Sequence, residues 1–182
     1  MKTNRILKLI TLSAAIFGFA ATSFAQYNNQ STATSNASAT IIKPLGIELV
    51  DGSALRFGNI VTSATAAGTV VVAPGATTAT YTGGAQAFTG AAAAGTRSAA
   101  NFTVTGEPGY TYAITLPADE TITISNGTQT MEVDTFKSTP GTTGTLSESG
   151  SQDLSVGATL HLVANQASGQ YTGNFNVTVA YN

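Results

Sequence analysis

The chain contains no cysteine and no tryptophan, only one histidine, and few charged side chains. Without cysteine it can form no disulfide framework, thiolate metal site or cysteine nucleophile, and it cannot carry a lipid on an N-terminal cysteine. Packing and sheet hydrogen bonds must therefore provide its stability. Beyond residue 25 no apolar run approaches the twenty residues that a membrane-spanning helix needs.

The first 25 residues have the three parts of a cleaved signal peptide. A positively charged start is followed by a short apolar run and a small-x-small site: Lys2, Arg5, Lys8, residues 9–21 and residues 23–25 (Ser-Phe-Ala). Such a pattern directs export, and we expect the mature chain to begin at Gln26. The sequence therefore predicts a protein of the periplasm, the cell surface or the extracellular space.

The mature chain of 157 residues (182 − 25) has the length of one domain. After the three signal-peptide cations are removed from seven Lys and Arg, four remain against nine Asp and Glu, a net charge of −5. A mildly acidic, sparsely charged surface argues against nucleic acid or anionic lipid as a partner.

Composition and pattern both favour strands. The chain is rich in Thr, Gly, Ala and Val, and it shows no amphipathic helix. Residues 26–38 are polar and predict a flexible leader, and residues 39–182 predict a single domain. Many short strands separated by turn signals indicate an all-β, antiparallel sandwich.

Residues 169–182 are the clearest predicted strand. Apolar side chains share one parity, with two glycines on the same parity: Gly169, Tyr171, Gly173, Phe175, Val177, Val179 and Tyr181. Polar side chains occupy most of the other parity, so the strand has one apolar and one wet face. This apolar face must be buried against its own sheet or against a partner, and the sequence leaves both open.

The first predicted strand, residues 39–49, also alternates. Its apolar members on one parity are Ile41, Leu45, Ile47 and Leu49. Pro44 and Gly46 interrupt it, which an edge position, a bulge or a switch between sheets would tolerate.

The remaining strands follow from alternation and turn residues. Residues 69–72 and 157–164 are expected to be strands, and residues 121–125 and 128–133 a hairpin around Asn126-Gly127. Residues 55–60 are interpreted as a short strand or extended segment, and residues 79–82 are a candidate for a short strand. Residues 100–105 and 110–116 are expected to pair across the turn at residues 106–109. Residues 62–68, 76–96 and 138–150 are interpreted largely as loops.

Candidate catalytic chemistry is sparse. His161 points to the wet side of its strand and has no second histidine or cysteine with which to share a metal. Glu132 and Asp134 lie two apart on one strand face, a spacing that would suit Ca²⁺ or an acid–base pair, although a solvated face explains them as well. We therefore expect no enzyme and no cofactor.

The sequence resembles the bacterial Domain of Unknown Function 4402 family of secreted proteins. The resemblance rests on residues 39–45 (ATIIKPL), 55–60 (LRFGNI), 102–112 (FTVTGEPGYTY), 157–160 (GATL) and the closing strand 169–182. It implies an immunoglobulin-like, Greek-key β-sandwich, and the family has no settled activity.

A looser resemblance is to pilins of the chaperone-usher pathway, including those similar to spore coat protein U. Those proteins end in an alternating strand with a penultimate Tyr and a Gly fourteenth from the end, as Tyr181 and Gly169 do here (182 − 169 + 1 = 14). The resemblance implies a groove beside the last strand that a periplasmic chaperone, and then another subunit, fills by strand addition. The pilin disulfide is absent, and the leader 26–38 lacks large apolar residues.

These observations predict a secreted, non-enzymatic structural protein, a cell-surface or fimbria-like subunit that assembles through its C-terminal strand. Copies of itself or a periplasmic chaperone are the expected partners. Residues 39–49 would donate a strand to another copy or close their own sandwich. The alternative is a self-contained adhesion module that binds glycan or a surface protein through loops 62–68 and 83–96.

Overall fold

The computed structural model describes residues 30–89 and 95–182. The predicted signal peptide and most of the Ala-rich loop at 91–95 lie outside these residues. The chain divides into two units, residues 1–39 and 40–182. In the first unit, the described residues 30–39 are exposed and form no strand.

The second unit is built from antiparallel strands, which confirms the predicted all-β fold. The first seven are β1 (Gly46–Leu49), β2 (Arg56–Phe57), β3 (Ile60–Thr62), β4 (Gly68–Val72), β5 (Thr80–Gly83), β6 (Ala85–Ala87) and β7 (Arg97–Ser98). The other seven are β8 (Ala100–Thr105), β9 (Thr111–Thr115), β10 (Ile122–Ser125), β11 (Thr130–Thr139), β12 (Thr143–Thr145), β13 (Ser151–Leu162) and β14 (Thr178–Tyr181). No described residue belongs to a helix long and apolar enough to cross a membrane.

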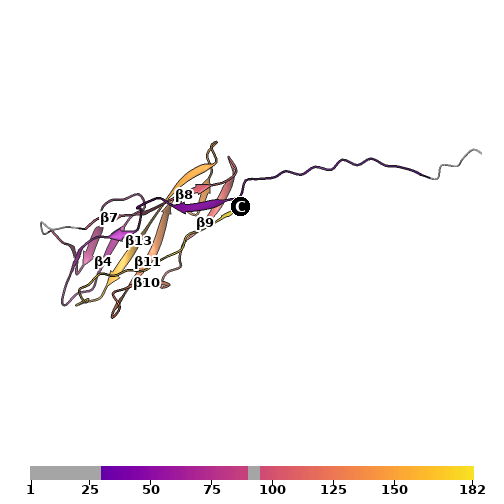
Figure 1. Cartoon of the computed structure of the whole chain (residues 1–182). Coiled ribbons are helices and arrows are strands. Elements are labelled where there is room, and N and C mark those ends of the chain that lie inside the picture. Colours follow the sequence, from indigo (N-terminus) through magenta and orange to yellow (C-terminus); the bar gives the residue numbers. More distant parts are fainter. Residues whose placement is uncertain (1–29, 90–94) are drawn as a thin grey trace, which may run out of the picture. The chain divides into compact units, whose positions relative to one another are not determined.

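The larger sheet is organised around the twelve-residue strand β13. One edge of β13 pairs with β11, and its other edge pairs first with β8 and then with β4. β1, β5 and β10 complete the sheet, and β4, β13, β11 and β10 lie side by side in Figure 1. Because the apolar side chains of β13 alternate from Leu154 to Leu162, one face of the strand supplies the core along its whole length.

The smaller sheet has the order β12, β9, β14. The predicted pairing of residues 100–105 with 110–116 is therefore wrong, because β8 belongs to the larger sheet and β9 to the smaller one. The turn at residues 106–110 carries the chain from one layer to the other. Alternation identifies the buried face of a strand but not its neighbour, and this is why the sequence suggested a hairpin here.

Other predicted elements changed at their ends. The Asn126-Gly127 hairpin is confirmed as β10 and β11, but β11 extends to Thr139. A short strand, β12, lies inside the predicted loop 138–150 and pairs with β9. β6 and β7 were also unpredicted, since three- and two-residue strands carry too little alternation to be detected.

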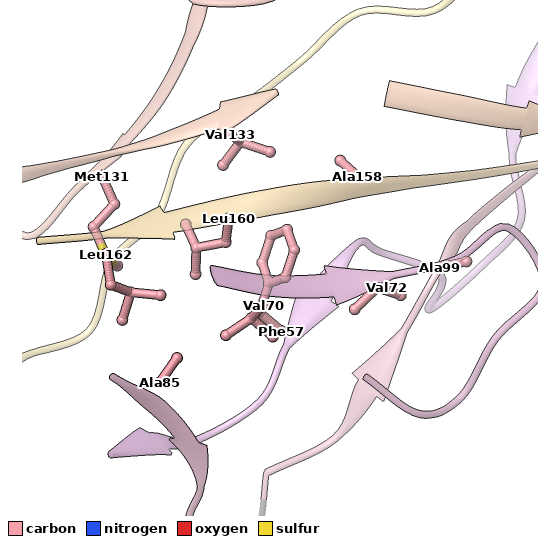
Figure 2. Close-up of a cluster of buried hydrophobic side chains, with 10 residues drawn as sticks. All are labelled: Phe57, Val70, Val72, Ala85, Ala99, Met131, Val133, Ala158, Leu160 and Leu162. Atoms are coloured by element: carbon pink, nitrogen blue, oxygen red, sulfur yellow. The ribbon is translucent and has the colours of Figure 1, made fainter. Parts of the chain in front are cut away.

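Two clusters of buried side chains fill the space between the layers. The closed core consists of Val104, Tyr112, Ile114, Leu146, Leu154 and Val156. The open core consists of Phe57, Val70, Val72, Ala85, Ala99, Met131, Val133, Ala158, Leu160 and Leu162, whose side chains gather between the strands in Figure 2. Strand β13 contributes to both, and Phe136 packs against both.

Candidate functional site

The C-terminal segment, residues 169–182, is extended but is not one continuous strand. Only Thr178–Tyr181 forms a ladder, with β9. Upstream, a single isolated bridge joins Thr172 to Ser125, and the N–H of each residue donates to the C=O of the other at 2.9–3.0 Å. The segment thus begins at the edge of β10 in the larger sheet and ends at the edge of β9 in the smaller one.

This crossing between layers explains why the predicted strand is interrupted. A chain that leaves one sheet edge for another must pass through residues that pair with neither edge. The departure from β10 is marked by a hollow of about 270 Å³ lined by Asn176, Thr178, Thr121 and Ile122. The apolar parity nevertheless faces inward, as expected: Tyr171 packs on the open core, and Phe175, Val177, Val179 and Tyr181 pack on the closed core.

A groove of about 940 Å³ lies beside the C-terminal segment. Its floor is the inner face of the larger sheet, formed by Ile122, Ile124, Met131, Val133, Leu160 and Leu162. Residues 166–175 form one wall and residues 55–60 the other. The second layer therefore covers the open core incompletely, whereas β9, β12 and β14 cover the closed core.

The C-terminal wall of the groove presents unpaired backbone. Within the described residues, no hydrogen bond joins the backbone of residues 173–176 to another residue. Successive backbone groups of an extended chain point to opposite sides. Because Thr172 pairs with β10, we infer from this alternation that the N–H and C=O groups of Gly173 and Phe175 face away from β10. Unpaired groups of this kind at a sheet edge are a template for another strand.

A buried glutamine holds the start of this wall. Gln166 is 8% exposed, and its amide nitrogen donates to Gln129 Oε1 at 3.1 Å and to the Tyr171 hydroxyl at 2.9 Å. The Tyr171 hydroxyl donates in turn to the carbonyl of Ala167. This network ties the wall to the β10–β11 hairpin, so the wall is in place without an occupant in the groove.

The penultimate Tyr181 fixes the entry of the first strand. Its hydroxyl donates to the Lys43 carbonyl at 2.8 Å and accepts the Glu107 N–H at 2.6 Å. The Lys43 N–H donates to the Glu107 carboxylate at 2.8 Å. A side chain at Gly106 would collide with the Tyr181 hydroxyl, so glycine is needed there. We name these contacts the Tyr181 latch.

The first strand pairs within its own chain. Gly46–Leu49 lies antiparallel to β8, and Leu45 and Ile47 pack against the closed core. The predicted strand of residues 39–49 therefore begins seven residues later than expected, after Pro44. Leu49 is exposed, and Ile41 is 95% exposed and belongs to no strand. Of the four apolar residues predicted to share one face, Leu45 and Ile47 thus pack against the core, whereas Ile41 and Leu49 are exposed.

The candidate chemical residues lie on the outer face of the larger sheet, away from the groove lining. His161 Nε2 and Asp134 Oδ1 are 2.8 Å apart, and the Thr135 hydroxyl donates to the same carboxylate oxygen. His161 is thus paired rather than merely solvated. Among the residues that the structure describes, no three His, Asp or Glu side chains are grouped to hold a metal ion. Glu132 and Asp134 therefore gain no third ligand of these types there.

The lining of the groove carries little charge. Among the described residues that line it, Arg56 is the one charged side chain, and its guanidinium donates to the Gly52 carbonyl and to Ser98. In the closed core, by contrast, desolvation by burial raises the pKa of Tyr112 above its ordinary value, and its hydroxyl donates to Gln152 Oε1 at 2.8 Å.

Sequence reasoning missed Gln166, and it predicted residues 55–60 only as a short strand or extended segment, not as a wall of the groove. A glutamine between two turns carries no periodic signal, and the strands Arg56–Phe57 and Ile60–Thr62 are too short to alternate clearly. The resemblance to the family did single out residues 55–60, but it gave them no role.

The model of the family described as Domain of unknown function (DUF4402) matches residues 47–181. No curated protein and no solved structure matches the chain. The match begins within β1 and ends within β14, so it covers the sandwich and both walls of the groove. The chain belongs to the DUF4402 family.

Proposed function

We propose that the protein is a secreted, non-enzymatic structural subunit of the cell surface, similar to a fimbrial subunit, that assembles by accepting a strand in its groove. The observation that carries this proposal is the unpaired backbone of residues 173–176 along the wall of a 940 Å³ apolar groove. A strand laid there would gain backbone hydrogen bonds from the wall and bury side chains on the floor.

The chemistry of the groove favours a peptide over a small polar ligand. Its floor is aliphatic, and within the described part of the chain Arg56 is the single charged residue of its lining. Aliphatic surface would reward any apolar molecule at about 25 cal/mol per Å². Only an extended backbone, however, would also satisfy the spaced N–H and C=O groups of Gly173 and Phe175.

The test is size-exclusion chromatography with light scattering on residues 26–182, purified from an export host. We expect the wild type to form assemblies or a complex with a chaperone, and Phe175→Asp together with Val177→Asp to abolish them. Asn176→Asp together with Thr178→Asp is the matched control, because both side chains are exposed on the opposite parity and neither residue lines the groove. If the double variant fails to fold by circular dichroism, Ile60→Asp on the opposite wall takes its place. A wild type that stays monomeric at every concentration, without a chaperone, would refute the proposal.

A second candidate function has one observation in its favour. Phe88 lies in the 83–96 region, lines the groove and is 40% exposed. An exposed aromatic ring at a loop is the kind of anchor that an adhesion module uses for a glycan or a surface protein. Glycan-array binding that Phe88→Ala removes, in a protein that remains monomeric, would favour this alternative.

A further inference from the structure

We propose that the turn of the β10–β11 hairpin is a self-modifying site, at which Asn126 loses its side-chain amide to attack by the backbone nitrogen of Gly127. The product is an aspartate or a β-linked isoaspartate at position 126, and water is the only co-reactant. Three features of the turn carry this inference: the residue that follows Asn126, the donors that hold its amide oxygen, and the segment that the turn anchors.

The nucleophile is the backbone nitrogen of Gly127. Asn126 is the only asparagine of the sequence that precedes a glycine. Glycine has no Cβ to obstruct the approach of its nitrogen to the preceding side chain. Because the two groups belong to neighbouring residues, the attack has the advantage of an intramolecular reaction. Gly127 is also exposed, so solvent can take the proton that its nitrogen must lose.

The electrophile is the side-chain carbonyl carbon of Asn126. Its oxygen, Oδ1, accepts three hydrogen bonds, from the Thr128 N–H at 3.0 Å, the Thr128 hydroxyl at 2.9 Å and the Gln129 N–H at 2.8 Å. Attack moves negative charge onto this oxygen, and donors that are already in place stabilise the charge, as in an oxyanion hole. The folded turn therefore holds the amide ready for attack.

The reaction exchanges one water molecule for one ammonia. The Gly127 nitrogen forms a bond to Asn126 Cγ and gives its proton to solvent. The bond from Cγ to Nδ2 then breaks, and this nitrogen takes a proton from solvent and leaves as ammonia, so that a succinimide ring remains. Water opens the ring at either carbonyl. One opening leaves a normal peptide bond and an aspartate, and the other routes the main chain through Cβ and Cγ as an isoaspartate.

The isoaspartate product would disturb the segment that the turn anchors. Gln129 Oε1 accepts hydrogen bonds from Gln166 Nε2 at 3.1 Å and from the Ala167 N–H at 3.0 Å. The Gln129 backbone is itself held by its bond to Asn126 Oδ1. An isoaspartate adds one atom to the main chain of the turn and moves the oxygen that accepts this bond. The groove wall at residues 166–175 would then lose its anchor at the hairpin.

Two further contacts place the turn against the same wall. Ser125 and Thr172 exchange both backbone hydrogen bonds at 2.9–3.0 Å. A Cβ added at Gly169 would lie 3.1 Å from Asn126 Nδ2, so the modification places a carboxylate beside this part of the wall. We therefore expect the wall to loosen as the protein ages. A matching loss of assembly would follow, and this last consequence alone rests on the proposed function.

Peptide mapping by mass spectrometry on the mature chain, residues 26–182, tests the chemistry. Folded protein incubated at neutral pH should convert Asn126 to aspartate and isoaspartate. Asn36 and Asn176 are exposed internal controls, and they should react at least ~10-fold more slowly because a side chain follows each of them. A folded protein in which Asn126 stays intact would overturn the inference. Conversion only in the urea-unfolded chain would do the same, because the turn would then protect the amide.

The role of the oxygen donors has its own matched variant. Thr128→Val keeps the shape of the side chain and removes one of the donors to Asn126 Oδ1. Conversion of the folded protein should slow at least ~3-fold, less than in a buried enzyme site because the turn is exposed. An equal or faster rate would contradict stabilisation of the oxyanion by the turn.

Amide hydrogen exchange of the purified isoaspartate form tests the effect on the wall. The N–H groups of Ala167 and Thr172 both donate to the hairpin in the unmodified protein. Their exchange should become at least ~10-fold faster after modification. Asn126→Asp is the matched control, because it adds the charge without lengthening the main chain, and its exchange should stay within about twofold of the wild type.

Unchanged exchange of Ala167 and Thr172 in the isoaspartate form would overturn the inferred effect on the wall. Equal acceleration in Asn126→Asp would show that charge, and not the lengthened main chain, loosens the wall, which contradicts the inferred cause. Neither peptide mapping nor monomer exchange depends on assembly. A wild type that never assembles would therefore refute the proposed function and leave the modification site standing.

Discussion

The two halves of the sandwich share strand β13 but differ in what covers them. Leu154 and Val156 of β13 belong to the closed core, beneath a second layer formed by β9, β12 and β14. Leu160 and Leu162 belong to the open core, where the second layer leaves the groove between residues 55–60 and 166–175. The larger sheet is thus covered by a second layer over the closed core and only partly covered over the open core.

This difference indicates that a partner strand would gain binding free energy in the open half and not in the closed half. In the closed half, β9 is already paired on both sides, with β12 and with β14, and the core side chains are buried. In the open half, an incoming strand would add both, since the floor is apolar and residues 173–176 have unpaired backbone. We therefore expect changes in the closed half to reduce stability alone, and changes in the open half to alter assembly as well.

The largest difference should appear when a buried leucine is truncated in each half. Leu154→Ala should lower the free energy of unfolding by about 3–5 kcal/mol, because it leaves a sealed cavity. Leu160→Ala should cost about 2–3 kcal/mol, because its side chain borders a groove that already exists. Urea unfolding of the monomer measures both values. Equal costs would show that the open core is as tightly enclosed as the closed one.

The next comparison uses a glutamine from each half. Gln166→Ala leaves Gln129 and Tyr171 without their partner, and Gln152→Ala does the same to Tyr112 and Thr145. Each change should cost about 1–3 kcal/mol. Only Gln166→Ala should accelerate amide hydrogen exchange in residues 167–175 and weaken assembly. Weakened assembly in Gln152→Ala as well would contradict the separation of the two halves.

Tyr112→Phe sharpens the description of the closed half. Loss of its hydrogen bond to Gln152 should cost about 1 kcal/mol at neutral pH, because Thr145 N–H still satisfies the glutamine oxygen. Burial raises the pKa of Tyr112 above 10.0, so the folded state holds its proton more tightly than the unfolded state. The wild-type free energy of unfolding should therefore fall as pH rises above about 10, and this part of the fall should be missing in Tyr112→Phe. Identical slopes of stability against pH would contradict it.

The smallest effect is expected outside both halves. His161→Ala removes the contact with Asp134 on the outer face of the sheet, where His161 is 42% exposed. Exposed ion pairs contribute between zero and about 1 kcal/mol, so unfolding should change by less than that. Assembly should not change at all. A loss of assembly would move attention from the groove to this outer face.

Much of the fold was predictable because alternation reports burial directly. The Asn126-Gly127 hairpin, β4, β8 and the inward parity from Tyr171 to Tyr181 all follow from residue spacing. Pairing partners did not follow, as the separation of β8 from β9 shows. Whether the strands before and after a turn pair depends on whether the turn stays in one layer or crosses to the other. The turn residues at 106–110 do not indicate which of the two occurs.

The candidate site was only half predictable for the same reason. The apolar face of the last strand was visible in the sequence, but its departure from β10 at Thr172 was not. The opposite wall at residues 55–60 and the buried Gln166 depend on contacts between distant segments. The groove exists because the second layer has no strand at this position. The spacing of residues within one strand does not indicate which strands lie beside it.

Amide hydrogen exchange at Gly173 and Phe175, followed in monomer and in assembly, reports directly whether the groove offers a free edge to another strand. In the monomer we expect exchange close to the unstructured rate, because these N–H groups have no acceptor among the described residues. Assembly should then slow their exchange at least ~100-fold, while Val104 in the closed half stays equally protected in both states. Protection of Gly173 and Phe175 already in the monomer would contradict the account, because the groove would then have no free edge to offer.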